Sequence, residues 1–281
     1  MQFHDRTLRA KRRLCWRLSL YLFRSLASGK VDKRSVVKHA DYIDSELPGL
    51  RRYARAATGC QETGDAIVKE ALKPFEADNA PSSLERLDLF RSIEQVLARS
   101  GNSGPFEGVA PLPSRAQLLT SIAGLSASDA ASLSGMTESE IRNLLETSRS
   151  GDASSDPADI FIIEDEPMIA AHLAEIAREM GHNVIGTTGI ASDAIRACRE
   201  RRPDLLLSDV MLGDERRGAD AAHDIASMYG IPVIFITAFP QSLLRGEKGE
   251  PAYLIEKPFR ADSVRVMISR ALGKSRSRPG A

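Results

Sequence analysis

The chain has 281 residues, of which 42% are hydrophobic and 27% charged, and its 38 basic residues balance its 38 acidic ones. This composition is typical of a folded globular protein and excludes a disordered or fibrous one. No run of 18 apolar residues occurs, so we expect no transmembrane helix, and the three widely spaced cysteines encode neither a disulfide framework nor a zinc site. We therefore expect a cytoplasmic protein.

The first 40 residues are strongly basic. They carry 11 Lys and Arg residues against 2 Asp and Glu, a net charge of +9, whereas residues 41–149 stand at −5 and residues 150–281 at −4. The apolar stretch Leu14–Leu26 behind the basic residues 6–13 could form an amphipathic helix on an anionic membrane surface, or the segment could bind nucleic acid. We favour a third interpretation, in which translation begins near Val36 or Val37 and the extension is not part of the protein.

Residues 41–149 show helical periodicity and no convincing strand. A helix is expected to open at Leu47-Pro48-Gly49-Leu50 and end at Gly59, and others cover 63–72, 82–101 and 113–124. The third of these begins with a capping box at Ser82 and Glu85. Two short helices follow on either side of Gly135, capped by Ser126-x-x-Asp129 and Thr137-x-x-Glu140. We divide this half into helices at 41–100, a flexible linker at 101–113 and a second helical unit at 114–149.

After a linker at 150–157, residues 158–273 alternate between apolar strands and helical patterns, and 274–281 form a tail. The expected strands are Ile160–Ile163, Val184–Thr187, Leu205–Ser208, Val233–Thr237 and Tyr253–Ile255. Strands this apolar are buried on both faces, as in a parallel sheet covered by helices. We therefore predict a multidomain chain, with an all-α N-terminal part and an α/β (βα)5 domain of the flavodoxin-like strand order 2-1-3-4-5.

Acidic residues follow two of these strands. Glu164, Asp165 and Glu166 come after the first strand, and Asp209 ends the third. In such sheets ligands bind beyond the carboxyl ends of the strands, at the switch point between strands one and three. Carboxylates packed there would repel one another unless they shared a hard cation, and Mg²⁺ prefers such oxygen ligands. A lysine at the same rim, Lys257, can pair with a phosphoryl oxygen.

The motifs Ile160-Phe-Ile-Ile-Glu-Asp-Glu-Pro167, Leu205-Leu-Leu-Ser-Asp209, Phe235-Ile-Thr-Ala-Phe239 and Glu256-Lys-Pro-Phe259 resemble those of two-component receiver domains, in the same strand order. The resemblance implies that Asp209 accepts a phosphoryl group. It also implies that Glu164 and Asp165 hold Mg²⁺ together with Asp209 and the carbonyl group of Met211. The implied switch and phosphoryl contacts are Thr237, Ala238, Lys257 and Pro258, the last after a cis peptide bond.

The chain departs from the receiver pattern at one position. Similar domains carry a switch aromatic residue three positions before the lysine, where this chain has Leu254. Tyr253 is one residue away and therefore faces the other side of the sheet. We expect the coupling of Thr237 to the rest of the domain to differ from the familiar threonine–tyrosine pair.

The helical half resembles sigma factors of the extracytoplasmic-function type. Leu47 to Gly59 is similar to the opening of their region 2, and the helix-turn-helix spacing of Ala131, Gly135, Ile141 and Leu144 is similar to region 4. The helix expected to read DNA, Glu138–Arg149, carries three acidic residues against two basic ones. Each phosphate that a DNA-binding protein neutralises needs a nearby cation, so this charge disfavours direct DNA binding.

A sigma-like half followed by a receiver resembles the PhyR-type response regulators of the general stress response. The resemblance implies partner switching without an enzymatic activity of its own. A sensor histidine kinase or phosphotransfer protein would phosphorylate the receiver, and the released sigma-like half would bind an anti-sigma factor of the NepR type. In the resting state the sigma-like half is expected to dock on the last helix and strand of the receiver. The alternatives are a receiver-controlled DNA-binding sigma factor or helix-turn-helix regulator, and an enzyme such as a phosphatase with an acidic metal site.

Overall fold

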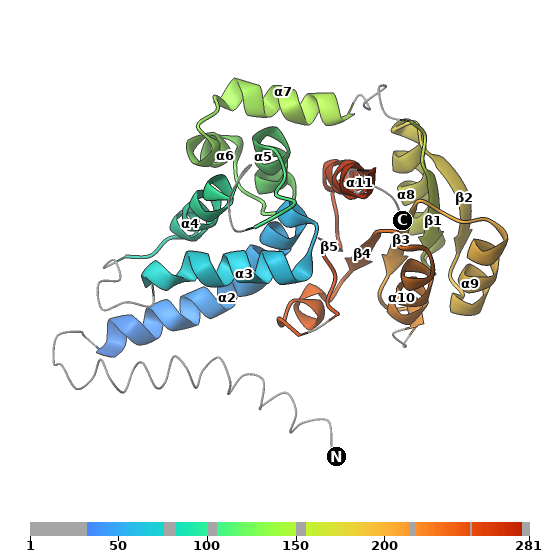
Figure 1. Cartoon of the computed structure of the whole chain (residues 1–281), viewed down its shortest axis with the longest axis horizontal. Coiled ribbons are helices and arrows are strands. Elements are labelled where there is room, and N and C mark those ends of the chain that lie inside the picture. Colours follow the sequence, from blue (N-terminus) through green and yellow to red (C-terminus); the bar gives the residue numbers. More distant parts are fainter. Residues whose placement is uncertain are drawn as a thin grey trace, which may run out of the picture.

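The structure is a computed structural model that describes residues 33–75, 83–100, 106–149, 156–213, 217–247 and 249–276. A group of helices lies beside an α/β domain built on a single parallel sheet (Figure 1), as the sequence predicts. The basic segment 1–32, on which the membrane and nucleic-acid interpretations rest, lies outside the described residues. Among the residues described, no helix is long and apolar enough to cross a membrane.

The N-terminal part is entirely helical within its described residues. Its elements are α2 (Lys33–Thr58), α3 (Gln61–Leu72), the short 3-10 helix η1 (Lys73–Phe75), α4 (Arg86–Arg99), α5 (Leu112–Ser121), α6 (Ala127–Ser134) and α7 (Glu138–Arg149). The predicted caps of the last two helices are confirmed. The Ser126 hydroxyl accepts a hydrogen bond from the Asp129 N–H at 3.0 Å, and Gly135 ends α6 with a φ of 70°.

Two predicted helix starts in this part are wrong. Helix α2 does not open at Leu47 but begins at Lys33 and runs through Pro48. An internal proline costs a helix about 3 kcal/mol, and the burial of Leu50 and Tyr53 just after it offsets that cost. Helix α4 begins at Arg86, because the Asp88 carboxylate accepts the Glu85 N–H at 3.1 Å and so places the cap three residues after the predicted one.

The C-terminal domain has the predicted sheet. Its strands are β1 (Asp159–Ile163), β2 (Asn183–Thr188), β3 (Leu205–Asp209), β4 (Val233–Thr237) and β5 (Tyr253–Glu256), all parallel and in the order β2-β1-β3-β4-β5. Helices α8 (Pro167–Glu179) and α11 (Ala261–Arg276) cover one face, and α9 (Ala191–Glu200) and α10 (Arg217–Tyr229) cover the other. Among its described residues, the fourth crossover contains a single helical element, the 3-10 helix η2 (Pro240–Leu243).

The N-terminal helices dock on one side of this domain. Helices α5 and α7 contact α11, and α2 contacts β5, so that α11 lies between the helical part and the sheet (Figure 1). One apolar cluster runs without a break from Leu50 in α2 through Ile268 in α11 to Ile234 in β4. The two parts therefore share a core, and the docking expected from the sequence is confirmed.

Candidate functional site

Three charged groups from three strand ends meet at the carboxyl edge of the sheet. Asp209 closes β3, Glu164 follows β1 and Lys257 follows β5. The Lys257 ammonium group lies 2.7 Å from Asp209 Oδ2 and 2.9 Å from Glu164 Oε1, and it donates hydrogen bonds to both. The Lys257–Pro258 peptide bond is cis, as predicted. The parallel topology thus brings together residues that are up to 93 positions apart in the chain.

Burial perturbs the charges at this edge. It raises the pKa of Glu164, and the Lys257 ammonium group only partly opposes that shift. For Lys257 itself burial alone would lower the pKa, but the hydrogen bonds to Asp209 and Glu164 outweigh it and leave the pKa above its ordinary value. The Lys257 ammonium group is therefore held between two carboxylates, and a change in charge at Asp209 would alter its hydrogen bonds.

The carboxylates fit a hard divalent cation. Oxygen atoms of Glu164, Asp165 and Asp209 all lie within 4.8 Å of one another. Glu164 Oε2 is buried and accepts no hydrogen bond from the described residues, although Lys257 lies 2.9 Å away. Glu164 and Asp209 are buried and Asp165 is exposed. This set of carboxylates suits Mg²⁺, which takes oxygen ligands and keeps several waters.

The backbone around Asp209 is fixed from two directions. The buried Ser208 hydroxyl donates to the Asp209 carbonyl oxygen at 2.8 Å, and the Met211 N–H donates to Asp209 Oδ1 at 3.1 Å. A Cβ atom on Gly218, in the first turn of α10, would fall 2.1 Å from the Asp209 carbonyl oxygen. Only a glycine therefore lets α10 begin this close to β3.

Thr237 and Ala238 stand at the end of β4, on the same edge. The Thr237 side chain is buried and accepts the Phe239 N–H at 3.1 Å, while Ala238 and Phe239 are exposed. Leu254 is buried beside Leu243 and Leu244, and Tyr253 packs on the opposite face in the core shared with α11, as predicted. The position of the usual switch aromatic residue is therefore filled by a leucine that packs in an aliphatic cluster.

The chain that leaves Thr237 leads directly to the helical part. We call residues 238–252 the β4–β5 segment. Its carbonyl groups at Leu243 and Leu244 accept hydrogen bonds from Arg55 and Arg51 of α2, at 3.2 and 2.7 Å. The Glu250 carboxylate accepts another from Arg55 at 2.7 Å. The sequence alone does not mark these arginines as contact residues, because their partners lie about 190 positions away.

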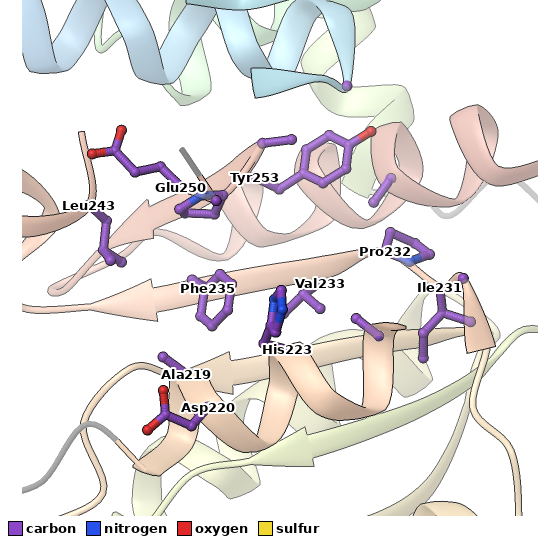
Figure 2. Close-up of a pocket in the computed structure, with 17 residues that line it drawn as sticks. Ala219, Asp220, His223, Ile231, Pro232, Val233, Phe235, Leu243, Glu250 and Tyr253 are labelled. Carbon is purple, nitrogen blue, oxygen red and sulfur yellow. The ribbon is translucent and has the colours of Figure 1, made fainter. Parts of the chain in front are cut away.

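A cavity of about 420 Å³ lies beside this segment. Figure 2 shows Val233 and Phe235 of β4 pointing toward His223 of α10, with Leu243 and Glu250 of the segment nearby. In a fully wound domain of this class a fourth helix would cover this part of the sheet. The short η2 takes the place of that helix, and the cavity lies between the β4–β5 segment, β4 and α10.

Comparisons with known proteins match both parts of the chain. Residues 160–269 match the response regulator receiver domain family, and residues 43–93 match the Sigma2 domain of PhyR. The phyllosphere-induced regulator PhyR of Methylorubrum extorquens is 38% identical over 252 residues, covering 83% of this chain and 94% of that protein. The chain belongs to the PhyR family. The predicted resemblance is thereby confirmed.

Solved PhyR structures share this arrangement over most of the chain. That of Brucella abortus is 35% identical with a TM-score of 0.74, and it covers 85% of this chain and 96% of the other. The anti-anti-sigma factor PhyR of Bartonella quintana is 33% identical with a TM-score of 0.74, covering 84% and 96%. The Bartonella quintana protein has also been solved in complex with the anti-sigma factor NepR. Sigma-like helices joined to a five-stranded receiver are thus the common architecture of the family.

Proposed function

We propose that this protein is a phosphorylation-dependent anti-anti-sigma factor that works by sigma-factor mimicry. A histidine kinase or phosphotransfer protein would transfer a phosphoryl group to Asp209. Mg²⁺ held by Glu164, Asp165, Asp209 and the Met211 carbonyl group would offset the charge of the transferred group. Lys257 would pair with the phosphoryl oxygens, and Thr237 with Ala238 would move toward them. The receiver contributes a phosphoacceptor and no catalysis of a separate reaction.

The observation that carries this proposal is the docking of α2 on the β4–β5 segment. That segment follows Thr237, at the strand end next to that of Asp209, and leads into β5 beside the arginines of α2. A phosphoryl group on Asp209 would draw Lys257 away from Glu164 and pull Thr237 inward. The segment would then leave α2, and the sigma-like helices would be free to bind an anti-sigma factor of the NepR type and so liberate the true sigma factor.

The free energy needed to separate the sigma-like helices from the receiver exceeds what phosphorylation typically supplies. Moving an equilibrium from 1:99 to 99:1 needs about 5.5 kcal/mol of differential free energy. Coupling between two sites typically supplies about 1–3 kcal/mol. We therefore infer that phosphorylation alone opens the protein incompletely and that binding of the anti-sigma factor completes the transition.

Direct DNA binding is the weaker hypothesis. Helix α7 is the counterpart of a recognition helix, and its exposed Arg142 forms an ion pair with Glu138 four residues earlier. The exposed Glu140 is engaged in capping Thr137. Little positive charge is left to face phosphates. A partner protein suits this surface better than a polyanion does.

The proposal is tested by the distance between α2 and the receiver. Spin labels at Asp44 on α2 and Asp224 on α10, each introduced as a cysteine in a chain whose natural cysteines are replaced, would report that distance. We expect acetyl phosphate with Mg²⁺ and the anti-sigma factor to add a population with a longer distance. An Asp209→Ala variant should keep the short distance throughout. An unchanged distance in the fully treated wild-type protein would contradict the release mechanism.

A further inference from the structure

Arg55 of α2 has a complete set of hydrogen bonds, and the receiver supplies more than half of them. Its Nε and Nη2 atoms donate to the two carboxylate oxygens of Asp65, both at 2.8 Å. Nη2 also donates to Glu250 at 2.7 Å, and Nη1 donates to the carbonyl oxygens of Leu243 and Pro251 at 3.2 and 3.4 Å. A guanidinium group has five N–H donors, so none is left over. Arg55 itself is fully buried.

Two neighbouring arginines point to the same side of α2. Arg51 donates to the Leu244 carbonyl group, and Arg52 forms an ion pair with Glu256 at 3.0 Å. We call Arg51, Arg52 and Arg55 the arginine face. With Asp65 beside it, this face keeps a net positive charge once the receiver has left. In the docked state the receiver covers it with two carboxylates and three main-chain carbonyl groups.

We propose that the arginine face is also a binding surface for the anti-sigma factor, and that an acidic segment of that partner replaces Glu250 and Glu256 on it. The inference rests on the proposed function, in which receiver and partner compete for the sigma-like helices. A partner that covers α2 again removes water from Arg55. It must then supply acceptors, because a buried guanidinium group left without them is strongly unfavourable.

The receiver itself indicates which chemistry fits. A carboxylate with adjacent main-chain carbonyl groups satisfies the outward donors of Arg55, and a second carboxylate meets Arg52. A protein segment with two acidic residues and an irregular backbone provides the same groups. A nucleic acid would offer phosphates to the arginines, but Arg55 is fully buried and its Nη1 atom donates to two neutral main-chain carbonyl groups, which a phosphate backbone does not supply. The acidic protein segment is therefore the occupant we assign.

The test compares variants on the two sides of the contact by measuring affinity for the purified NepR-type anti-sigma factor, with and without acetyl phosphate and Mg²⁺. Glu250→Gln weakens only the receiver's hold, so it should raise the affinity of the unphosphorylated protein about tenfold. Arg55→Lys weakens both competing contacts. It should leave the unphosphorylated affinity within twofold of wild type and lower the phosphorylated affinity at least tenfold. Arg52→Gln should change the two affinities in the same direction as Arg55→Lys. Because the Arg52 side chain is more exposed than that of Arg55, this variant does not require repacking of a buried site.

Contrary outcomes are distinct. If Arg55→Lys and Arg52→Gln raise the unphosphorylated affinity as Glu250→Gln does, and leave the phosphorylated affinity unchanged, the face serves docking alone and the inference is wrong. Loss of promoter-DNA retention in these variants, with partner affinity unchanged, would instead assign the face to nucleic acid. A wild-type protein indifferent to phosphodonor would contradict the proposed function itself. Arg196→Lys on α9, an exposed arginine that pairs with Asp193 three residues before it, is the matched control and should behave as wild type.

Discussion

Replacing Gly218 with alanine tests whether the start of α10 positions Asp209, the proposed phosphoacceptor. The added Cβ atom would lie 2.1 Å from the Asp209 carbonyl oxygen and 3.2 Å from Leu212 Cγ. An ordinary contact between carbon and oxygen is about 3.3 Å or longer. Either the Asp209 backbone or the first turn of α10 must therefore move by about 1 Å. The Ser208 hydroxyl, which donates to the same carbonyl group, would have to follow.

Two general magnitudes apply to this change, one for stability and one for the rate of phosphorylation. Overpacking of a tight site costs about 1–3 kcal/mol of folding free energy. A 1 Å misplacement of a reacting group can cost about 100-fold in rate. We expect the rate of phosphorylation by acetyl phosphate at saturating Mg²⁺ to fall about ten- to hundredfold, while the protein remains folded. The affinity for Mg²⁺ should fall as well, because Asp209 is one of the carboxylates assigned to the ion.

The assay follows phosphoprotein formation by intact-protein mass spectrometry, together with thermal unfolding of the same samples. Gly273→Ala in α11 is the matched control, because no group from other elements of the described residues lies within 4 Å of a Cβ atom there. It should keep the wild-type rate and gain a few tenths to about 1 kcal/mol from the better helix propensity of alanine. A Gly218→Ala protein with a lowered melting temperature but the wild-type phosphorylation rate would refute the positioning role and leave only a packing role.

Three further predictions concern the rest of the molecule. Tyr53→Phe removes the hydroxyl group that donates to the buried Glu94 carboxylate, and it should lower the free energy of unfolding in urea by about 1.5–3 kcal/mol; no change would contradict the bond. Arg270→Met removes the receiver's hydrogen bonds to the carbonyl groups that end α2, so it should raise the affinity of the unphosphorylated protein for its partner. The pKa of the buried Cys198 thiol is raised to about 11. Iodoacetamide at pH 8 should therefore modify Cys60 and not Cys198, and peptide mass spectrometry that finds Cys198 modified first would refute this order.

The receiver half could be predicted almost entirely from the sequence. Its strands are short apolar runs buried on both faces, so composition alone marks them, and parallel topology then forces Glu164, Asp209 and Lys257 to one edge. The structure of the connection between β4 and β5 was harder to predict from the sequence. The segment after Thr237 has the length of a short helix, but Pro240 fixes only its first turn, and the packing of Leu243 against Leu254 decides the rest.

The helical half and the contact between the two parts depend on interactions that are distant in sequence. Helix α2 continues through Pro48 because tertiary burial outweighs a local penalty, which no local rule anticipates. The capping residue of α4 is chosen between two similar candidates by a single carboxylate, Asp88. Arg55 meets Glu250 across 195 positions, and an arginine on a helix gives no sign of its partner. The docked arrangement follows from the family resemblance, but the residues that hold it require the structure.

The central claim is that phosphorylation of Asp209 makes the sigma-like helices available to an anti-sigma factor. The most direct test is the affinity of the purified chain for its NepR-type partner, measured with and without Mg²⁺ and acetyl phosphate, beside an Asp209→Ala variant. We predict tight binding that requires the phosphodonor and is lost in the variant. A change in affinity of less than twofold, or no binding in either state together with salt-sensitive retention on promoter DNA, would contradict the claim.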